Sequence, residues 1–418
     1  MSMKTERKRD SQQWLLDHMV KTTGRVINFA YDQRIVPPEV KSYAMIPRVV
    51  EKHARHIEQI ARAAEAAGHH VTAGELYWLA GEQYREAQHA IFEDDNPEKI
   101  YLHGKLLDCF EKVMQFAPHP IERVEIPFGE VFIQGVLHML PGRPKAPTVL
   151  FIPGMDMTKE ATIDAIHHPF VARGLNCLHI DGPGQGTSNL RKIRVTAENY
   201  RLAGRAAIDW LVTRPEVDAG RIAVSGFSFG SYWGMEIAAI DRRVKAVATA
   251  AACYGPKRAI FEQASPRFKQ VFMYMAGIHD EAAFDAMAEK MTLDALAPQI
   301  ACPCLQVVGE YDPLAPLEEV LDVYRRVPPP RELWVVENDF HVPRGVENFG
   351  GTAFYGCLAD WIGDAFAGRK PASLDEIRLV RQKDGPGPYG APIEGVRLPE
   401  RIGQHGGLSA AQRGPSGN

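Results

Sequence analysis

A five-residue stretch built from glycine, serine and phenylalanine is the first sign of chemistry in this sequence. Ser228 stands at the centre of residues 226–230, Gly-Phe-Ser-Phe-Gly, after the apolar run 222–224 and before a small-residue helix. A sharp turn from strand to helix exposes a serine hydroxyl, and glycines on either side relieve the crowding. We therefore predict that Ser228 is a nucleophile, the alternative being an ordinary serine in a small-residue turn.

A nucleophilic serine needs a base, and the base needs an acid to orient it. For a serine on such a turn the expected chain order is Ser, acid, His. Asp312 stands at the end of the strand pattern 304–312, and His341 follows the strand pattern 332–339. The carboxyl ends of parallel strands meet at one edge, so both side chains are expected near Ser228. Glu310 is a rival acid, a turn or helix cap is the other reading of Asp312, and a solvated loop histidine is the other reading of His341.

The negative charge on a tetrahedral intermediate requires backbone N–H donors. One candidate is the amide of Phe229, the residue after the nucleophile. The other is the amide of Met155, in the loop that follows the apolar run 148–152. These two amides form the predicted oxyanion hole.

The elements that must position these residues change character along the chain. Residues 1–120 are predicted to form a helical cap or dimerisation segment, mostly helical from about residue 11. Gly68 is placed to end its first long helix, Thr72 and Glu75 predict a capping box, and Asn96 before Pro97 predicts a helix start.

Residues 121–368 are predicted to form the catalytic domain. Two strands joined at residues 128–130 come first, and apolar strands alternating with helices follow, which predicts a mostly parallel, doubly wound sheet. Residues 254–299 contain no strand pattern and are predicted to be a helical lid insertion over the carboxyl edge. Residues 369–418 are predicted to be a Pro/Gly-rich tail, partly extended and without chemistry.

Composition excludes several classes of function. A net charge of −4 over 418 residues provides no basic surface for nucleic acid and no cationic face for a membrane. No apolar run is long enough to span a bilayer, and the charged start does not resemble a secretory signal, so a cytoplasmic setting is expected. Cys302 and Cys304 lack the second pair that a zinc site would need. We expect no metal and no cofactor.

Three stretches together resemble one branch of the α/β hydrolases. They are DGPGQGTS (181–188), PGMDMTKE (153–160) and GFSFGSYWG (226–234), and a helical segment precedes the sheet. The branch includes dihydroxypseudooxynicotine hydrolase, the fungal polyketide-shortening hydrolases and the fermentation–respiration switch protein family. The resemblance covers roughly residues 15–367 and implies an α/β-hydrolase fold, a homodimer whose helical part covers the active site, and, in some members, hydrolysis of a carbon–carbon bond beside a ketone.

Cleavage of a carbon–carbon bond requires a proton for the departing carbon. The resemblance implies an additional glutamate after the sixth strand, and Glu262 is the nearest match, with a solvated lid carboxylate as the alternative. Asp156 replaces the glutamate that the branch has in its oxyanion loop. Five aromatic residues are candidates for the pocket or for the core: Tyr232, Trp233, Phe261, Phe272 and Tyr274.

The sequence thus predicts a serine hydrolase that acts on a small carbonyl compound through an acyl-enzyme. The leading reaction is carbon–carbon hydrolysis of an aromatic ketone or β-diketone, as in the catabolism of aromatic compounds. The alternative is a carboxylesterase acting on an aryl or alkyl ester. A third reading is a non-catalytic binding or regulatory protein.

Overall fold

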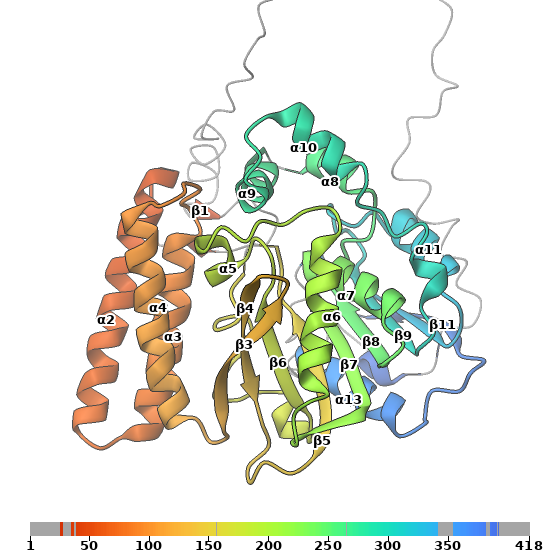
Figure 1. Ribbon diagram of the computed structural model, residues 1–418, viewed down its shortest axis with the longest axis horizontal. Coiled ribbons are helices and arrows are strands. Elements are labelled where there is room, and N and C mark those ends of the chain that lie inside the picture. Colours follow the sequence, from red (N-terminus) through yellow and green to blue (C-terminus); the bar gives the residue numbers. More distant parts are fainter. Residues whose placement is uncertain are drawn as a thin grey trace, which may run out of the picture.

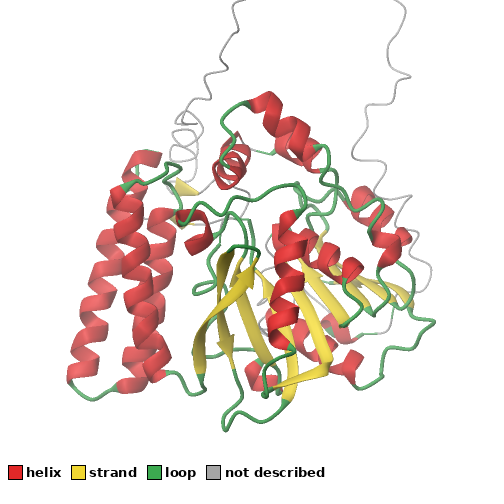
Figure 2. Cartoon of the chain, in the orientation of Figure 1, coloured by secondary structure: helices red, strands yellow, loops and turns green. Residues whose placement is uncertain are grey.

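The computed structural model describes residues 39–155, 157–264, 266–341, 354–381, 385–390 and 392, together with the backbone of 26–27 and 35–36. Figure 1 shows three layers: a bundle of helices at one end, a twisted sheet with helices on both faces, and a helical insertion above the sheet. The same arrangement appears in Figure 2, where helices and strands are coloured separately.

Three long helices form the N-terminal bundle, and they confirm most of the predicted pattern. The first ends where Gly68 takes a positive φ of 77°. The last begins after Asn96, whose side chain accepts a hydrogen bond from the Lys99 amide at 3.0 Å. The capping box predicted from Thr72 is wrong, because that helix begins two residues earlier, after His69, without a side-chain cap. The three are α2 (Ile46–Ala66), α3 (His70–Gln88) and α4 (Pro97–Phe116).

The bundle is joined to the sheet by an apolar contact. Its buried residues form one cluster with Ile121 and Val136 of the first two sheet strands and with Ile166 of a loop. Ahead of the bundle, β1 (Val26–Ile27) and β2 (Ile35–Val36) pair antiparallel. The expectation of helix from residue 11 is wrong at these four positions, and the rest of 11–38 lies outside the described residues. No helix in the described ranges is both long enough and apolar enough to cross a membrane.

The central sheet has nine strands in the order β11-β10-β9-β8-β7-β5-β6-β4-β3. All neighbours pair in parallel except β3 with β4 and β4 with β6. The doubly wound, mostly parallel sheet predicted from the apolar runs is thus confirmed. The strands are β3 (Ile121–Phe128), β4 (Val131–His138), β5 (Ala146–Ile152), β6 (Asn176–Asp181), β7 (Val217–Phe227), β8 (Val244–Ala250), β9 (Cys304–Gly309), β10 (Arg331–Val336) and β11 (Asp375–Val380).

Two separate apolar cores cover the two faces of the sheet. Successive residues of β5 alternate between them: Leu150 belongs to the core beneath α6 and α7, whereas Val149 and Phe151 belong to the core beneath α13. This alternation is what a strand buried on both faces requires. The remaining helices of this domain are α5 (Gly186–Leu190), α6 (Asn199–Leu211), α7 (Phe229–Ile240), α11 (Leu317–Arg326) and α13 (Phe354–Phe366).

The insertion between β8 and β9 is helical, as predicted. It contains α8 (Lys257–Gln263), α9 (Pro266–Ala276), α10 (Glu281–Ala288) and a short 3-10 turn. Phe272 of α9 packs against Phe229 at the start of α7, with ring centroids 4.8 Å apart. The insertion therefore lies over the sheet edge from which α7 begins, as Figure 1 shows.

The last strand comes from the segment predicted to be a tail. β11 pairs in parallel with β10 from Arg331 opposite Asp375 to Val336 opposite Val380. The boundary placed at residue 368 therefore falls before the end of the sheet. The polar residues of this edge strand hid it, because an edge strand needs only part of its surface to be apolar.

Candidate active site

Ser228 lies at the turn between β7 and α7, in a backbone conformation that few side chains adopt. Its φ is 57° and its ψ is −126°. A Cβ on Gly226 would lie 2.1 Å from the carbonyl oxygen of Gly230, and one on Gly230 would lie 2.1 Å from the carbonyl oxygen of Ile152. Both positions therefore exclude any side chain. A strained serine held by close backbone packing is the arrangement found where a nucleophile is presented.

The structure brings the three predicted catalytic side chains together in one chain of contacts. The Oγ of Ser228 lies 2.7 Å from Nε2 of His341. On the other side of the imidazole, Nδ1 of His341 lies 2.8 Å from Oδ2 of Asp312. Asp312 and His341 are both 3% exposed. The carboxylate is also held by its own turn, because its Oδ1 accepts from the Leu314 amide at 2.8 Å.

The rival acid is engaged elsewhere. Glu310 accepts a hydrogen bond from the Asn338 amide at 3.0 Å, with no contact to His341.

The two predicted oxyanion donors belong to segments that lie next to the serine. Phe229 follows Ser228 at the first turn of α7. The other loop is equally close, since a Cβ on Gly154, the residue before Met155, would lie 3.4 Å from the Cβ of Ser228. Within the described part of the chain, neither amide N–H has a hydrogen-bond partner. Asp156, the next residue, lies outside the described residues.

The loop that carries Met155 is anchored by a buried ion pair that the sequence analysis did not identify. The Nζ of Lys159 bonds to Oδ2 of Asp181 at 2.8 Å, and the Lys159 amide bonds to Oδ1 at 2.8 Å. Burial alone would raise the pKa of Asp181, but the Lys159 ammonium and two backbone amides keep it below its ordinary value. The Lys159 ammonium also lies 2.7 Å from Oε1 of Glu160, an ion-pair contact without hydrogen-bond geometry. Burial raises the pKa of Glu160.

The DGPGQGTS stretch completes this support. Gln185 bonds through Nε2 to the carbonyl oxygen of Gly154 at 2.6 Å, so it fixes the start of the oxyanion loop. Gly186 has a φ of +38°, and a Cβ there would lie 2.3 Å from the Asp181 carboxylate. Thr187 then bonds to Asp181 through its amide at 2.8 Å, and its hydroxyl lies 3.1 Å from Nε2 of His103 in α4. The stretch thus links the helical bundle to the loop beside Ser228. Its run of small and polar residues was the feature of the sequence from which these contacts could have been anticipated.

Glu262 is placed away from these contacts. Its side chain is 54% exposed and lies 3.0 Å from Arg258 of the same helix, which also pairs with Glu289. Among the described residues it makes no contact with Ser228, His341 or Asp312. This environment is that of the solvated lid carboxylate weighed as its alternative.

A buried group of histidines was also missed by the sequence analysis. The ring nitrogens of His138, His168 and His179 lie within 4.8 Å of one another. His168 and His179 are joined through their Nε2 atoms at 3.0 Å, and His119 joins His138 at 3.0 Å. Burial lowers the pKa of all four, to about 4 for His119 and about 3 for His179. Neutral imidazoles are the form that binds a metal ion, although here the rings bind one another.

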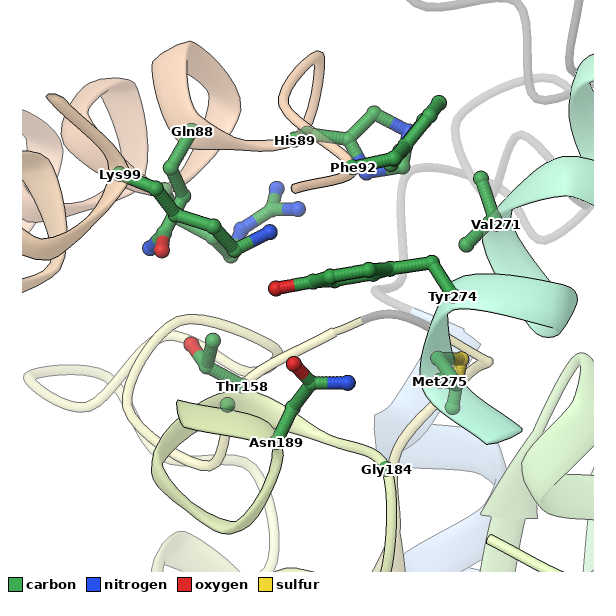
Figure 3. Close-up of a pocket in the computed structure, with 12 residues that line it drawn as sticks. Gln88, His89, Phe92, Lys99, Thr158, Gly184, Asn189, Val271, Tyr274 and Met275 are labelled. Carbon is green, nitrogen blue, oxygen red and sulfur yellow. The ribbon is translucent and has the colours of Figure 1, made fainter. Parts of the chain in front are cut away.

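A pocket opens between the helical bundle, the DGPGQGTS stretch and α9. Figure 3 shows the ring of Tyr274 reaching across it, with Gln88 and Lys99 on one side and Thr158 and Asn189 on the other. Of the five aromatic residues considered from the sequence, Tyr274 lines this pocket. The other four are buried in the core beneath α7 and the insertion.

Comparison with known proteins agrees with this architecture. Residues 52–311 match the family of FrsA-like esterases. Alpha/beta hydrolase xenA of Xenoacremonium sinensis is 27% identical over 256 residues, which are 57% of this chain and 58% of that protein. The 2,6-dihydropseudooxynicotine hydrolase of Paenarthrobacter nicotinovorans is 26% identical over 292 residues, 68% of this chain and 76% of that protein. Esterase FrsA of Enterobacter sp. (strain 638) is 29% identical over 226 residues, 50% of this chain and 53% of that protein.

These matches leave part of several relatives uncovered, since the chain spans little more than half the length of xenA and of FrsA. Among solved structures, 2,6-dihydroxy-pseudo-oxynicotine hydrolase superposes with a TM-score of 0.68 at 23% identity, covering 82% of this chain and 93% of that one. This likeness establishes the fold. With a family match over more than half of its residues, the chain belongs to the FrsA-like esterase family of α/β hydrolases.

Proposed function

We propose that the protein is a serine hydrolase in which Ser228 attacks a carbonyl carbon, His341 acts as general base and Asp312 orients the imidazole. The observation that carries this proposal is the unbroken chain of contacts from Ser228 Oγ through His341 to Asp312, at 2.7 and 2.8 Å. A base within hydrogen-bond distance of the nucleophile and oriented by a third group is the arrangement that activates a serine.

The reaction proceeds in two halves. His341 takes the proton of Ser228 as the oxygen adds to the carbonyl carbon, and the amides of Met155 and Phe229 bind the resulting oxyanion. His341 then gives this proton to the leaving group, which departs as an acyl-enzyme forms. A water molecule, deprotonated by the same imidazole, adds to the acyl carbon, and collapse releases the acid and restores Ser228.

Hydrolysis of an ester is the reaction that the geometry supports best. An alkoxide or phenoxide leaving group requires no proton donor beyond the histidine of the triad. Glu262, the donor predicted for a carbon leaving group, is exposed and paired with Arg258. The proposal therefore reverses the order of the two reactions favoured from the sequence.

Carbon–carbon hydrolysis of an aromatic ketone or β-diketone remains the second candidate. It is favoured by the similarity to 2,6-dihydropseudooxynicotine hydrolase, which extends over 76% of that protein. In this reaction the protonated His341 would have to deliver its proton to a carbanion. The homodimer and the cytoplasmic setting stay predictions.

The first test is covalent labelling with a fluorophosphonate probe. The wild type should be labelled, and Ser228→Ala should lose both labelling and at least about 10⁴-fold in kcat on an aryl ester. Ser225→Ala is a matched control, because Ser225 lies on β7, three residues before Ser228, is buried and makes no hydrogen bond through its hydroxyl in the described structure. It should keep both signals. An unlabelled wild type would contradict the proposal.

A second test separates the two reactions. Turnover of an aryl ester is compared with that of the matching ortho-hydroxyaryl ketone, with Ser228→Ala as the blank. Ester turnover alone supports the esterase assignment. Ketone cleavage at an equal or higher rate would replace it with carbon–carbon hydrolysis.

A further inference from the structure

The pocket beside the predicted oxyanion loop contains several buried polar atoms that have no hydrogen-bond partner in the described part of the chain. These are Nε of Arg85, Nε2 of Gln88, Oγ1 of Thr158, and both Nδ2 and Oδ1 of Asn189. The four residues are between 3 and 7% exposed. A buried polar atom without a hydrogen bond destabilises the fold, so a group of them around one cavity points to a ligand that satisfies them.

The pocket is lined in part by the two segments that support the predicted catalytic residues, the loop of Met155 and the DGPGQGTS stretch. Thr158 lies in the loop that carries Met155, directly before Lys159. Gly184 and Gly186, which also line the pocket, flank Gln185, and Gln185 holds the carbonyl of Gly154 beside Ser228. A ligand in this pocket therefore contacts the segments that hold the oxyanion loop.

The charges and donors that line the pocket favour an anion. The guanidinium of Arg85, whose charge is offset in part by Glu86, and the ammonium of Lys99 line the pocket, and no carboxylate is among the lining residues of the described structure. Arg85 is ion-paired with Glu86, and Lys99 bonds to the Ile91 carbonyl at 2.8 Å, so both cations are held in place. Among the unpartnered groups, N–H and O–H donors outnumber the single obligate acceptor, Oδ1 of Asn189.

The apolar part of the pocket favours a flat ring. Phe92 and Tyr274 lie with ring centroids 6.2 Å apart, and the Lys99 ammonium lies 4.6 Å from the centre of the Tyr274 ring. Figure 3 shows Tyr274 between the polar groups of the bundle and those of Thr158 and Asn189. Aromatic walls with a few convergent polar groups are typical of a small-molecule site.

We infer that the preferred substrate is an aromatic acyl compound that carries a carboxylate, and that Arg85, Gln88 and Asn189 bind this carboxylate. The inference rests on the proposed function, since the ligand is taken to be the substrate of Ser228. Charge-assisted hydrogen bonds to a carboxylate would satisfy the unpartnered donors with little rearrangement of the side chains.

The test compares two esters that differ only in charge, 4-nitrophenyl (4-carboxyphenyl)acetate and its neutral 4-carbamoyl analogue. The wild type should favour the carboxylate by about tenfold or more in kcat/KM, as expected for hydrogen bonds to a charged group. Lys99→Met should reduce the preference, and Asn189→Asp should abolish or invert it by placing a negative charge in the pocket. Arg258→Met, at an exposed site outside the pocket, should keep the wild-type preference. Thermal unfolding checks that each variant is folded.

Binding of the product 4-carboxyphenylacetate to Ser228→Ala, measured by calorimetry, separates the two proposals. Hydrolysis of both esters at equal kcat/KM would overturn the carboxylate site and leave the hydrolase assignment standing. Binding of the carboxylate to Ser228→Ala, with loss on Asn189→Asp, combined with no hydrolysis of either ester by the wild type, would overturn the hydrolase assignment and keep the site.

Discussion

The oxyanion-loop anchor and the neighbouring pocket are both buried and polar, yet they differ in how their polar atoms are satisfied. In the anchor, the Asp181 carboxylate accepts from Lys159 twice and from Thr187 once. In the pocket, the side chains of Gln88, Thr158 and Asn189 keep atoms without partners. The difference teaches that the residues that hold the predicted oxyanion loop are fixed in advance, whereas the proposed ligand site leaves hydrogen bonds for a ligand to complete.

The largest effect, a loss of kcat, is expected for a change in the predicted triad. Asp312→Asn should lower kcat on the order of 10³- to 10⁴-fold, because the amide cannot stabilise the imidazolium and favours the wrong tautomer of His341. Initial rates on an aryl ester measure this loss. Glu310→Gln is the matched control, since Glu310 bonds to the Asn338 amide and not to the histidine. A loss of equal size in Glu310→Gln would show that the acid has been misassigned.

Breaking the anchor should mainly cost stability. Lys159→Met leaves Asp181 and Glu160 buried without their cation, which typically costs about 3–5 kcal/mol in the free energy of unfolding. Urea unfolding measures this loss. Arg258→Met removes one cation of an exposed pair, and its cost should be within about 1 kcal/mol. Similar losses in the two variants would mean that the Lys159 pair is no stronger than a surface pair.

The histidine group sharpens the comparison, because it is polar, buried and neutral. Burial lowers the pKa of folded His179 to about 3, against about 6.5 in an unfolded chain. The unfolded state therefore binds more protons, and stability should fall as the pH drops below about 6.5, by about 1.4 kcal/mol per pH unit for each such histidine, until the folded pKa is reached. Urea unfolding between pH 7.5 and 5 should show this slope.

The pH slope has its own control. His179→Leu should reduce the slope of the unfolding free energy with pH by up to about 1.4 kcal/mol per pH unit, the contribution of one proton. His167→Leu, at a side chain that is 67% exposed, should leave this slope unchanged. An identical slope in the wild type and in His179→Leu would contradict the assignment of a neutral, buried His179.

The smallest effect on the free energy of unfolding is expected in the pocket, where polar atoms lack hydrogen-bond partners among the described residues. Thr158→Val removes a hydroxyl that has no partner, so the free energy of unfolding should change by no more than about 0.5 kcal/mol or should rise. Thr249→Val is the paired counterpart. Its buried hydroxyl contacts Tyr254 and bonds to the Leu305 carbonyl at 3.3 Å, and its loss should cost about 1–2 kcal/mol. If Thr158→Val costs as much as Thr249→Val, the Thr158 hydroxyl has a partner after all.

Local pattern was enough to predict the strands of the central sheet from β3 to β10 and the three residues of the predicted triad. An apolar strand followed by Gly-x-Ser-x-Gly constrains its own backbone, because the glycines at 226 and 230 are positions where any Cβ would collide with the main chain. Asp312 and His341 could be predicted for a related reason. Each lies in the loop after an apolar strand, and parallel strands end at a common edge of the sheet. These properties depend on residues close together in the sequence.

The tertiary structure decided what depends on contacts between distant segments. The environment of Glu262 followed from the face of α8 that turns to solvent, and β11 joined the sheet because β10 offered an unpaired edge. Three arrangements join residues up to about 190 positions apart: the pairing of Lys159 with Asp181, the gathering of four histidines from four separate stretches, and the convergence of Arg85, Asn189 and Tyr274 around one pocket. No local periodicity encodes such contacts, because they arise only when the packing of the helical bundle and the insertion against the sheet brings those side chains to one place.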